Sequence, residues 1–174
     1  MAEAQVDLFE RLVMPHLNDA YTLARYLLHD EHDAQDVVQE AVLRAIRHID
    51  GFRHGDPRAW LLTIVRNCSY TWHKSHKRER SNVSLSDVSA MNVQDAQTAD
   101  DATIRASESD LVRAAIDKLP NELREVLVLR ELNELSYRDI SEVVGIPMGT
   151  VMSRLARARE RLADALSDGA RKVG

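Results

Sequence analysis

The segment 136–162 constrains the fold more than any other part of the chain, because it has the pattern of a helix-turn-helix. Ser136 is expected to cap a short helix over 137–144, and Gly145 can adopt the positive φ with which many helices end. A longer basic helix is then expected from about residue 149 to 166. Proteins with two helices around such a turn place the second helix in the major groove of DNA.

The longer helix has two different faces. At 100° per residue, its apolar side chains form one narrow stripe that must pack on other helices. This stripe consists of Val151, Leu155, Ala158 and Leu162. The opposite side carries Met152, Ser153, Ala156 and Arg157, flanked by Arg154 and Arg161. Arg157 suits a guanine edge and the two flanking arginines suit phosphates, although a solvated arginine face is the plain alternative.

Apolar spacing in the N-terminal part is also helical. A first helical stretch over 8–27 is expected to break or kink at Pro15. Asp33 can cap a second helix that runs to about residue 49. A turn-rich loop follows, and Pro57 then stands at the start of a helix that is expected to reach about Lys77.

The chain divides at a polar stretch without periodicity, residues 81–105, which has the composition of a flexible linker. Helical spacing resumes over 106–119 and again over 121–132. No segment has confident strand alternation. The sequence therefore predicts an all-α chain of two small helical domains, 1–80 and 106–174, joined by a flexible linker.

Composition favours a soluble cytoplasmic protein. The single cysteine, Cys68, excludes an internal disulfide and is typical of a reducing compartment. No signal peptide or membrane span is recognisable, so no membrane insertion is expected. The net charge of -5 is patchy: 30–40 holds five acids and no Lys or Arg, 66–80 five bases and one acid, and 154–161 four bases and one acid. Two basic patches and one acidic patch suit DNA at two places and a basic protein at a third.

The acidic patch begins a helix with one exposed apolar residue. Opposite its apolar face lie Asp36, Gln39, Glu40, Leu43 and Arg47. An apolar anchor ringed by polar groups suits a protein interface, but a solvated face with one stray leucine is equally compatible with these residues.

The basic patch at 66–80 is interleaved with aromatic residues. The rings are Trp60, Tyr70 and Trp72, and the cations are Arg66, Lys74, Lys77, Arg78 and Arg80. Cations hold phosphates and rings stack on unpaired bases, so the mixture suits single-stranded DNA. Alternatively, Trp60 and one other ring belong to the core and the basic end of the helix is merely solvated. Trp60 is expected in the core, and Trp72 is equally compatible with the core and with DNA.

Metal chemistry and catalysis find little support. Cys68, His73 and His76 have a spacing that matches no common zinc site. No sequence motif indicates a nucleophile with its general base, and none indicates a phosphate-binding glycine loop. We expect no cofactor and no enzymatic activity.

Two stretches resemble a known family. DAQDVVQEA followed by AWLLTIVRN, and then LPNELREVLVLRELNELSYRDISEVVGIPMGTVMSRLARARERL, are similar to extracytoplasmic-function (ECF) sigma factors of the sigma-70 family. The resemblance covers about 8–80 and 106–166. It implies a sigma region 2 domain at 1–80, a region 4 domain at 106–174, and a linker that threads through the polymerase cleft. It also implies a function, promoter-specific transcription initiation in response to stress.

The resemblance assigns roles and partners. The core RNA polymerase would bind Asp33, Asp36, Gln39, Glu40 and Leu43. Phe52 and Asn67 match a pocket for a flipped minus-ten base, and the minus-ten contacts would extend along Tyr70, Trp72, Lys74, Lys77 and Arg78. The minus-35 helix would use Met152, Ser153, Arg154, Ala156, Arg157 and Arg161, and Met152 departs from the basic residue common there. An anti-sigma protein is the implied inhibitor.

Two other functions compete with this interpretation. A helix-turn-helix regulator could bind duplex DNA without binding polymerase, and an enzyme could use Cys68 with the histidines. The N-terminal half discriminates against the regulator, because a repressor needs neither an acidic helix nor an aromatic-basic one.

Overall fold

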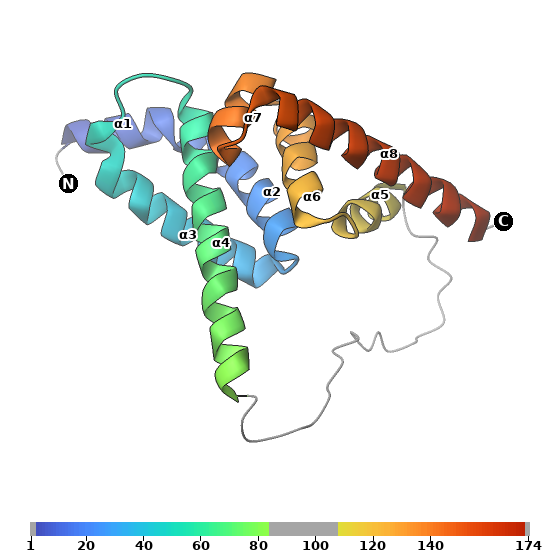
Figure 1. Ribbon diagram of the computed structural model, residues 1–174. Coiled ribbons are helices and arrows are strands. Elements are labelled where there is room, and N and C mark those ends of the chain that lie inside the picture. The colour runs from blue at the N-terminus through green and yellow to red at the C-terminus, as the bar shows by residue number, and fades with distance from the viewer. Residues whose placement is uncertain (1–2, 84–107, 173–174) are drawn as a thin grey trace.

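The computed structural model describes residues 3–83 and 108–172, and every regular element in these two ranges is a helix (Figure 1). The N-terminal half comprises α1 (Glu3–Leu12), η1 (Met14–His16), α2 (Leu17–Leu28), α3 (Glu31–His48), η2 (Ile49–Gly51) and α4 (Pro57–Val83). The C-terminal half comprises α5 (Glu108–Asp117), α6 (Asn121–Leu127), η3 (Val128–Leu132), α7 (Tyr137–Val144) and α8 (Met148–Lys172). The prediction of an all-α chain with two helical regions is confirmed, and none of the described helices has the length and apolarity that a membrane span requires.

The N-terminal half is a bundle in which α2, α3 and α4 pack on one another. Each contributes an apolar stripe with helical spacing, and the largest side chains with almost no exposed surface include Leu23, Ile49, Leu61 and Leu62. Small residues of α3, such as Ala41 and Ala45, are fully buried and let the neighbouring helices approach closely. The bundle thus leaves one face of α3 and part of α4 on the surface.

Local sequence signals explain most helix ends in this half. Pro15 lies in the short η1 turn that separates α1 from α2, as expected from a residue that cannot continue a helix. His29 ends α2 in the left-handed region at φ 61°. The predicted cap of α3 is wrong by one turn: Asp30, not Asp33, is the N-cap, because its carboxylate accepts a hydrogen bond from the Asp33 backbone N–H at 3.0 Å.

The C-terminal half contains the predicted helix-turn-helix. The Ser136 hydroxyl caps α7 by accepting from the Asp139 backbone N–H at 3.1 Å, and Gly145 ends the helix with φ 75°. α8 packs on α5, α6 and α7 through Val151, Leu155 and Ala158, which are all buried. The expected helix over 121–132 is interrupted, since its last turn is the π-helical η3.

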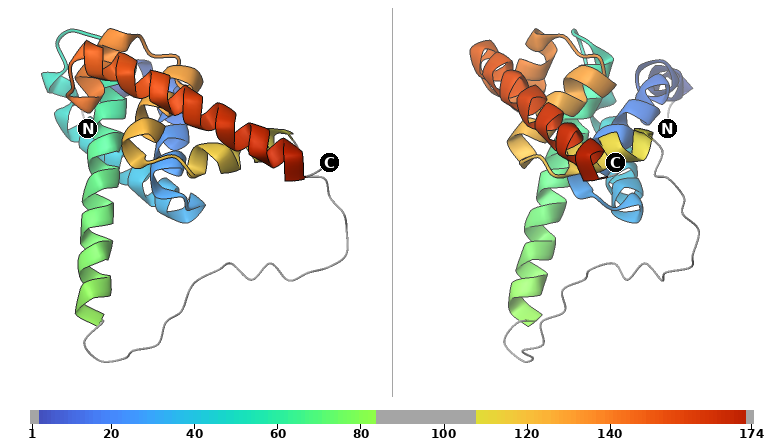
Figure 2. Two further views of the ribbon diagram at one scale, coloured as in Figure 1. Left: turned by 45° about the vertical axis from the view of Figure 1, so that its right-hand side comes forward. Right: turned by 90° about the vertical axis from the view of Figure 1, so that its right-hand side faces the viewer.

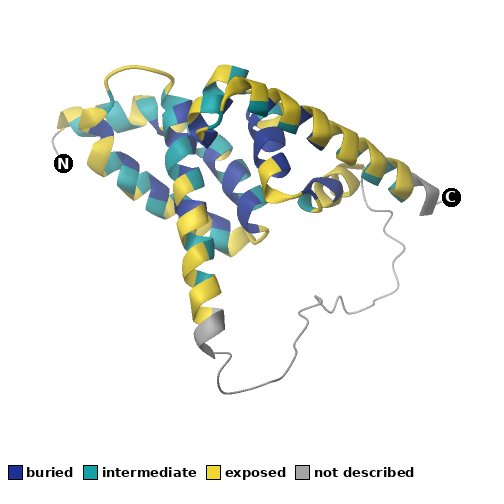
Figure 3. Cartoon of the chain, in the orientation of Figure 1, coloured by how far each residue is buried: buried dark blue, intermediate teal, exposed yellow. Residues whose placement is uncertain are grey.

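The two halves pack against each other. α4 contacts α7, and α2 contacts both α6 and η3. Figure 2 shows α4 between the other N-terminal helices and the helix-turn-helix, with its C-terminal part extending beyond the bundle. Figure 3 shows that much of this extension is exposed, as is the outer face of α8. Of the predicted linker 81–105, residues 81–83 belong to α4 and the remainder lies outside the described residues.

Candidate interaction surfaces

The exposed face of α3 carries an apolar residue among acidic and polar ones. Asp36 and Gln39 are exposed, and the Leu43 side chain is 49% exposed although it is a large aliphatic group. Glu40 is half-buried and accepts a hydrogen bond from Arg44 Nε at 2.7 Å. Asp33 is also half-buried, and burial, followed by the neighbouring Asp30 carboxylate, raises the pKa of its carboxyl above the usual value.

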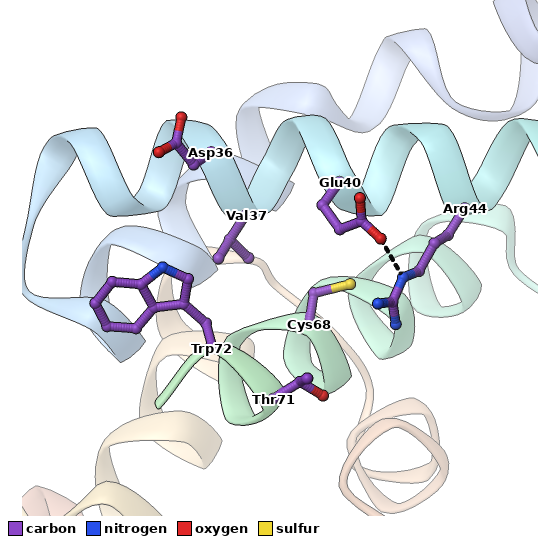
Figure 4. Close-up of a pocket in the computed structure, with 7 residues that line it drawn as sticks. All are labelled: Asp36, Val37, Glu40, Arg44, Cys68, Thr71 and Trp72. Atoms are coloured by element: carbon purple, nitrogen blue, oxygen red, sulfur yellow. Dashed lines mark hydrogen bonds and ion pairs between the residues drawn. The ribbon is translucent and has the colours of Figure 1, made fainter. Parts of the chain in front are cut away.

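A hollow of about 180 Å³ lies beside this face, between α3 and α4 (Figure 4). Figure 4 shows the Trp72 indole below Val37 and Asp36, with the Cys68 thiol and the Glu40–Arg44 pair further along the same hollow. Burial raises the pKa of the Cys68 thiol, so the sulfur is held as a neutral thiol rather than as a thiolate. Among the residues that the structure describes, no cluster of three or more potential metal ligands occurs.

Trp72 is oriented by its neighbours on α4. Its ring stacks on His76 with centroids 3.7 Å apart and an interplanar angle of 17°, and it meets the edge of His73 at 5.6 Å. The indole is half-buried and packs against the core. Trp72 therefore lies on the side of α4 that faces α3, next to the acidic face.

A second hollow, of about 310 Å³, forms where the loop 51–56 meets the start of α4. Phe52 and Trp60 line it, with ring centroids 5.2 Å apart and tilted by 45°. Thr63 adds a hydroxyl from α4, and Glu142 reaches the hollow from α7 of the other half. Asn67, expected beside Phe52, does not line this hollow and is exposed one turn further along α4.

The remaining residues predicted to bind the minus-ten strand lie on two parts of α4. Tyr70 lies at the contact between the halves, where its hydroxyl donates to Glu125 Oε2 at 3.1 Å. Lys74, Lys77 and Arg78 are all exposed on the extension of α4. The structure thus does not gather the predicted minus-ten residues in one place but distributes them over residues 67–78 of α4 and the loop before this helix.

The outer face of α8 has the predicted composition. Met152, Ser153, Ala156, Arg157 and Arg161 are all exposed. Arg154 differs from them because its side chain is only 17% exposed, with Nη2 3.7 Å from a carboxylate oxygen of Glu122. Arg154 is therefore held at the edge of the exposed face, and its side chain is less free than that of Arg157 to contact a base.

Comparison with known families covers both halves. The family described as sigma-70 region 2 matches residues 12–79, and the family described as sigma-70 region 4 matches residues 109–162. A relative named ECF RNA polymerase sigma factor EcfG, from Rhodopseudomonas palustris, is 38% identical over 81% of this chain and 76% of its own length. The chain is an ECF sigma factor of the sigma-70 family. Members of this family are non-catalytic transcription initiation factors that bind core RNA polymerase and direct it to promoters.

Other relatives agree with this assignment. The RNA polymerase sigma-H factor of Pseudomonas aeruginosa is 34% identical over 91% of this sigma factor and 86% of its own length. The sigma factor RpoE, solved in complex with the anti-sigma factor NepR from Bartonella quintana, has a TM-score of 0.73 at 27% identity and covers 91% of this chain and 96% of its own. CnrH, solved with the cytosolic domain of CnrY, has a TM-score of 0.62 at 25% identity, with 92% and 88% covered.

One interaction in this sigma factor was not predicted from the sequence: the ion pair of Arg66 with Glu125. Arg66 donates from Nε to Glu125 Oε2 at 2.8 Å and from Nη2 to Oε1 at 3.2 Å. Burial alone lowers the pKa of the Arg66 guanidinium, but the hydrogen bond and charge of Glu125 outweigh burial and raise it above its ordinary value. The only sequence signal was an acidic residue inside the apolar segment 123–129, and it gives no indication of a partner 59 residues away.

Proposed function

We propose that this ECF sigma factor divides its contacts among the three surfaces described above. Residues 1–80 act as the region 2 domain and residues 106–174 as the region 4 domain, with 81–105 connecting them. The acidic face of α3 binds core RNA polymerase. The loop 51–56 and α4 hold the opened minus-ten strand, and α8 reads the minus-35 element.

The exposed leucine on α3 carries the polymerase assignment. A large aliphatic group that is 49% exposed inside a ring of acidic and polar side chains is typical of an interface anchor with a polar rim. The acidic rim calls for a basic partner surface. The neighbouring hollow between α3 and α4 offers space for one apolar side chain of that partner beside Trp72.

The minus-ten assignment rests on the types of side chain along one surface, namely aromatic rings and cations, rather than on a single pocket. Phe52 and Trp60 supply rings beside a hollow large enough for a base, and the cations Lys74, Lys77 and Arg78 follow along α4. We assign Asn67 to this surface as a polar group on the same helix, outside the hollow itself. On α8, the exposed Arg157 reads base edges, while Arg154 and Arg161 hold phosphates.

We also propose control by an anti-sigma protein in the cytoplasm, in response to stress. Support for an anti-sigma partner comes from RpoE and CnrH, whose structures were solved with NepR and with the cytosolic domain of CnrY. An inhibitor that covers the α3 face would exclude polymerase, because both would need the same exposed leucine and acids.

The polymerase assignment is tested by reversing charge on α3. The double variant Asp36→Arg/Glu40→Arg should weaken binding to core polymerase at least about tenfold, because like charges then face each other across the interface. The matched control is Asp7→Arg/Glu10→Arg on α1, which makes the same change in charge on exposed residues outside the matched family regions. Unchanged core affinity of the α3 variant, measured by pull-down alongside a melting curve, would sink the assignment.

A further inference from the structure

The start of α8 differs in chemistry from the rest of the helix. Residues 148–153 carry no charged side chain, whereas four arginines follow in 154–161. Met148 is 45% exposed and Met152 is 49% exposed, although both have large apolar side chains. Because they are four residues apart, they lie one above the other on the same side of the helix. The helix assigned to the minus-35 element therefore begins with an apolar strip, formed by Met148 and Met152, that faces solvent.

The arginines of α8 do not cover this strip. Arg159 donates to one oxygen of Glu131 from Nε at 3.0 Å and from Nη2 at 2.6 Å, so its donors are directed toward α6 and η3. Arg154 is held at the edge of the exposed face, as described above. Arg157 and Arg161 are exposed, but they come one turn or more after the strip. Base reading by charged groups therefore falls to the later turns of α8.

The residues beside the strip leave base reading in the first turns to the methionines. The Ser153 hydroxyl donates to the Thr150 backbone carbonyl at 3.1 Å, so its single proton is used within the helix. A Cβ added at Gly149 would meet no atom within 4 Å, so packing among the described residues does not require glycine there. At about 100° per residue, Gly149 and Ser153 lie between Met152 and Arg157 on the outer face. Their small size lets a base-pair edge approach the helix closely.

An apolar strip in the major groove selects one chemical feature. The base edges there present hydrogen-bond donors and acceptors, and thymine adds an apolar C5-methyl group. The recognition helix of a helix-turn-helix contacts base edges with its N-terminal residues, which brings Met148 and Met152 to the bases. The unbranched, polarisable side chain of methionine adapts well to such a contact. Against a cytosine amino group the same side chain would only cover a polar group without bonding to it.

The geometry of the helix sets how many base pairs the strip spans. Residues that are four apart are separated by about 6 Å along an α-helix. Successive base pairs are separated by about 3.4 Å. Met148 and Met152 therefore reach different base pairs, and two thymines within about three successive base pairs fit both side chains.

We propose that Met148 and Met152 read thymine in the minus-35 element by contact with its C5-methyl group. This inference rests on the proposed minus-35 role of α8 and adds a preference that the arginines do not supply. The minus-35 element of this sigma factor then contains thymines, on either strand, close to the base pair that Arg157 reads.

The test uses holoenzyme assembled from the full-length chain and core polymerase, with duplex promoter fragments selected from a library by run-off transcription. Each thymine of the minus-35 element is replaced in turn by deoxyuridine, which removes the methyl group and keeps the base pairing. At the contacted thymines this replacement should weaken binding about fourfold, the effect of leaving one methyl-sized group unburied. Met148→Ala/Met152→Ala should bind the thymine and uracil forms equally, because no side chain then meets the methyl group.

The matched control is Met14→Ala. Met14 is also 49% exposed, but it lies in η1 of the other half, so its removal should leave the fourfold difference intact. Equal binding of the two DNA forms by wild-type holoenzyme would overturn the proposal. A difference that persists in Met148→Ala/Met152→Ala, or selected elements that contain no thymine, would overturn it as well.

Scrambling the whole minus-35 element separates this inference from the function on which it rests. If scrambling leaves binding by the holoenzyme unchanged, the minus-35 role of α8 is wrong and the methyl contact is wrong with it. If scrambling weakens binding but deoxyuridine does not, the methyl contact alone is overturned.

Discussion

Replacing Arg66 with alanine is expected to destabilise the contact between the two halves far more than the distance between Arg66 and Glu125 alone indicates. Arg66 and Glu125 form an ion pair at 2.8 Å in which the two side chains are 20% and 2% exposed. Arg159 and Glu131 form a shorter pair, at 2.6 Å, in which they are 49% and 48% exposed. The two pairs separate the effect of burial from the effect of distance.

The magnitude follows from the charge that remains. Removing one partner of a buried pair costs about 3–5 kcal/mol, because the other charge is left uncompensated. The Tyr70 hydroxyl still donates to Glu125, so we expect a cost of about 3 kcal/mol, or roughly a hundredfold in the ratio of molecules with packed halves to molecules with separated halves. Arg159→Ala should cost less than about 1 kcal/mol, as solvated pairs do.

The assay is urea denaturation monitored with two spectroscopic signals. Both tryptophans lie in α4, so fluorescence reports the N-terminal half, whereas far-UV circular dichroism reports every helix. In the wild type the two transitions should coincide, because the packed halves unfold together. In Arg66→Ala the two transitions should separate. Glu125 is hydrated once the halves part, so the cost of leaving its charge unpaired weakens only the contact between the halves.

A paired substitution tests the physical reason. Arg66→Met with Glu125→Leu removes both charges and keeps similar volumes, so the two transitions should coincide again. If Arg66→Ala and Arg159→Ala shift the urea midpoint equally and leave the signals coincident, burial of Glu125 does not control the contact between the halves.

Two predictions concern DNA. Arg157→Ala should reduce the free energy of DNA binding by about 1–3 kcal/mol and relax the preference at one base pair of the minus-35 element, whereas Arg154→Ala should weaken binding to all sequences alike and lower the salt dependence of binding by about one ion. Both effects are measured by titrating DNA at several salt concentrations. If Arg157→Ala weakened binding to every sequence equally, base reading by Arg157 would be refuted. Phe52→Ala and Asn67→Ala should impair open-complex formation more than closed-complex binding, as judged by permanganate footprinting beside melting curves. Normal strand opening in a folded Asn67→Ala variant would count against its role.

Signals within a few residues predicted much of the fold. Ser136 and Gly145 define the ends of α7 because a hydroxyl cap and a left-handed glycine act on adjacent backbone. The same local rule failed at α3, where Asp30 and Asp33 both have cap chemistry and only the chain entering from His29 determines which one caps. The alternating burial along α8 followed from its 3.6-residue periodicity.

The parts of the site that depend on distant contacts were beyond sequence reasoning. The residues near Trp72 in the sequence are the same whether its ring faces DNA or α3. Its stacking on His76 and its place beside Val37 in the hollow between α3 and α4 show its orientation. Glu125 and Glu142 belong to a half whose position relative to α4 no local pattern encodes. Arg66 was recognisable as a cation but not as the partner of a buried acid.

The proposed function requires that this one chain binds core polymerase and opens promoters. The most direct measurement is run-off transcription with purified core RNA polymerase on a library of promoter fragments, with and without this sigma factor. We expect discrete transcripts that require both promoter elements and are lost when the spacer between them is lengthened. Binding to duplex DNA with no transcript from the library would contradict it and would indicate a helix-turn-helix regulator that does not engage polymerase.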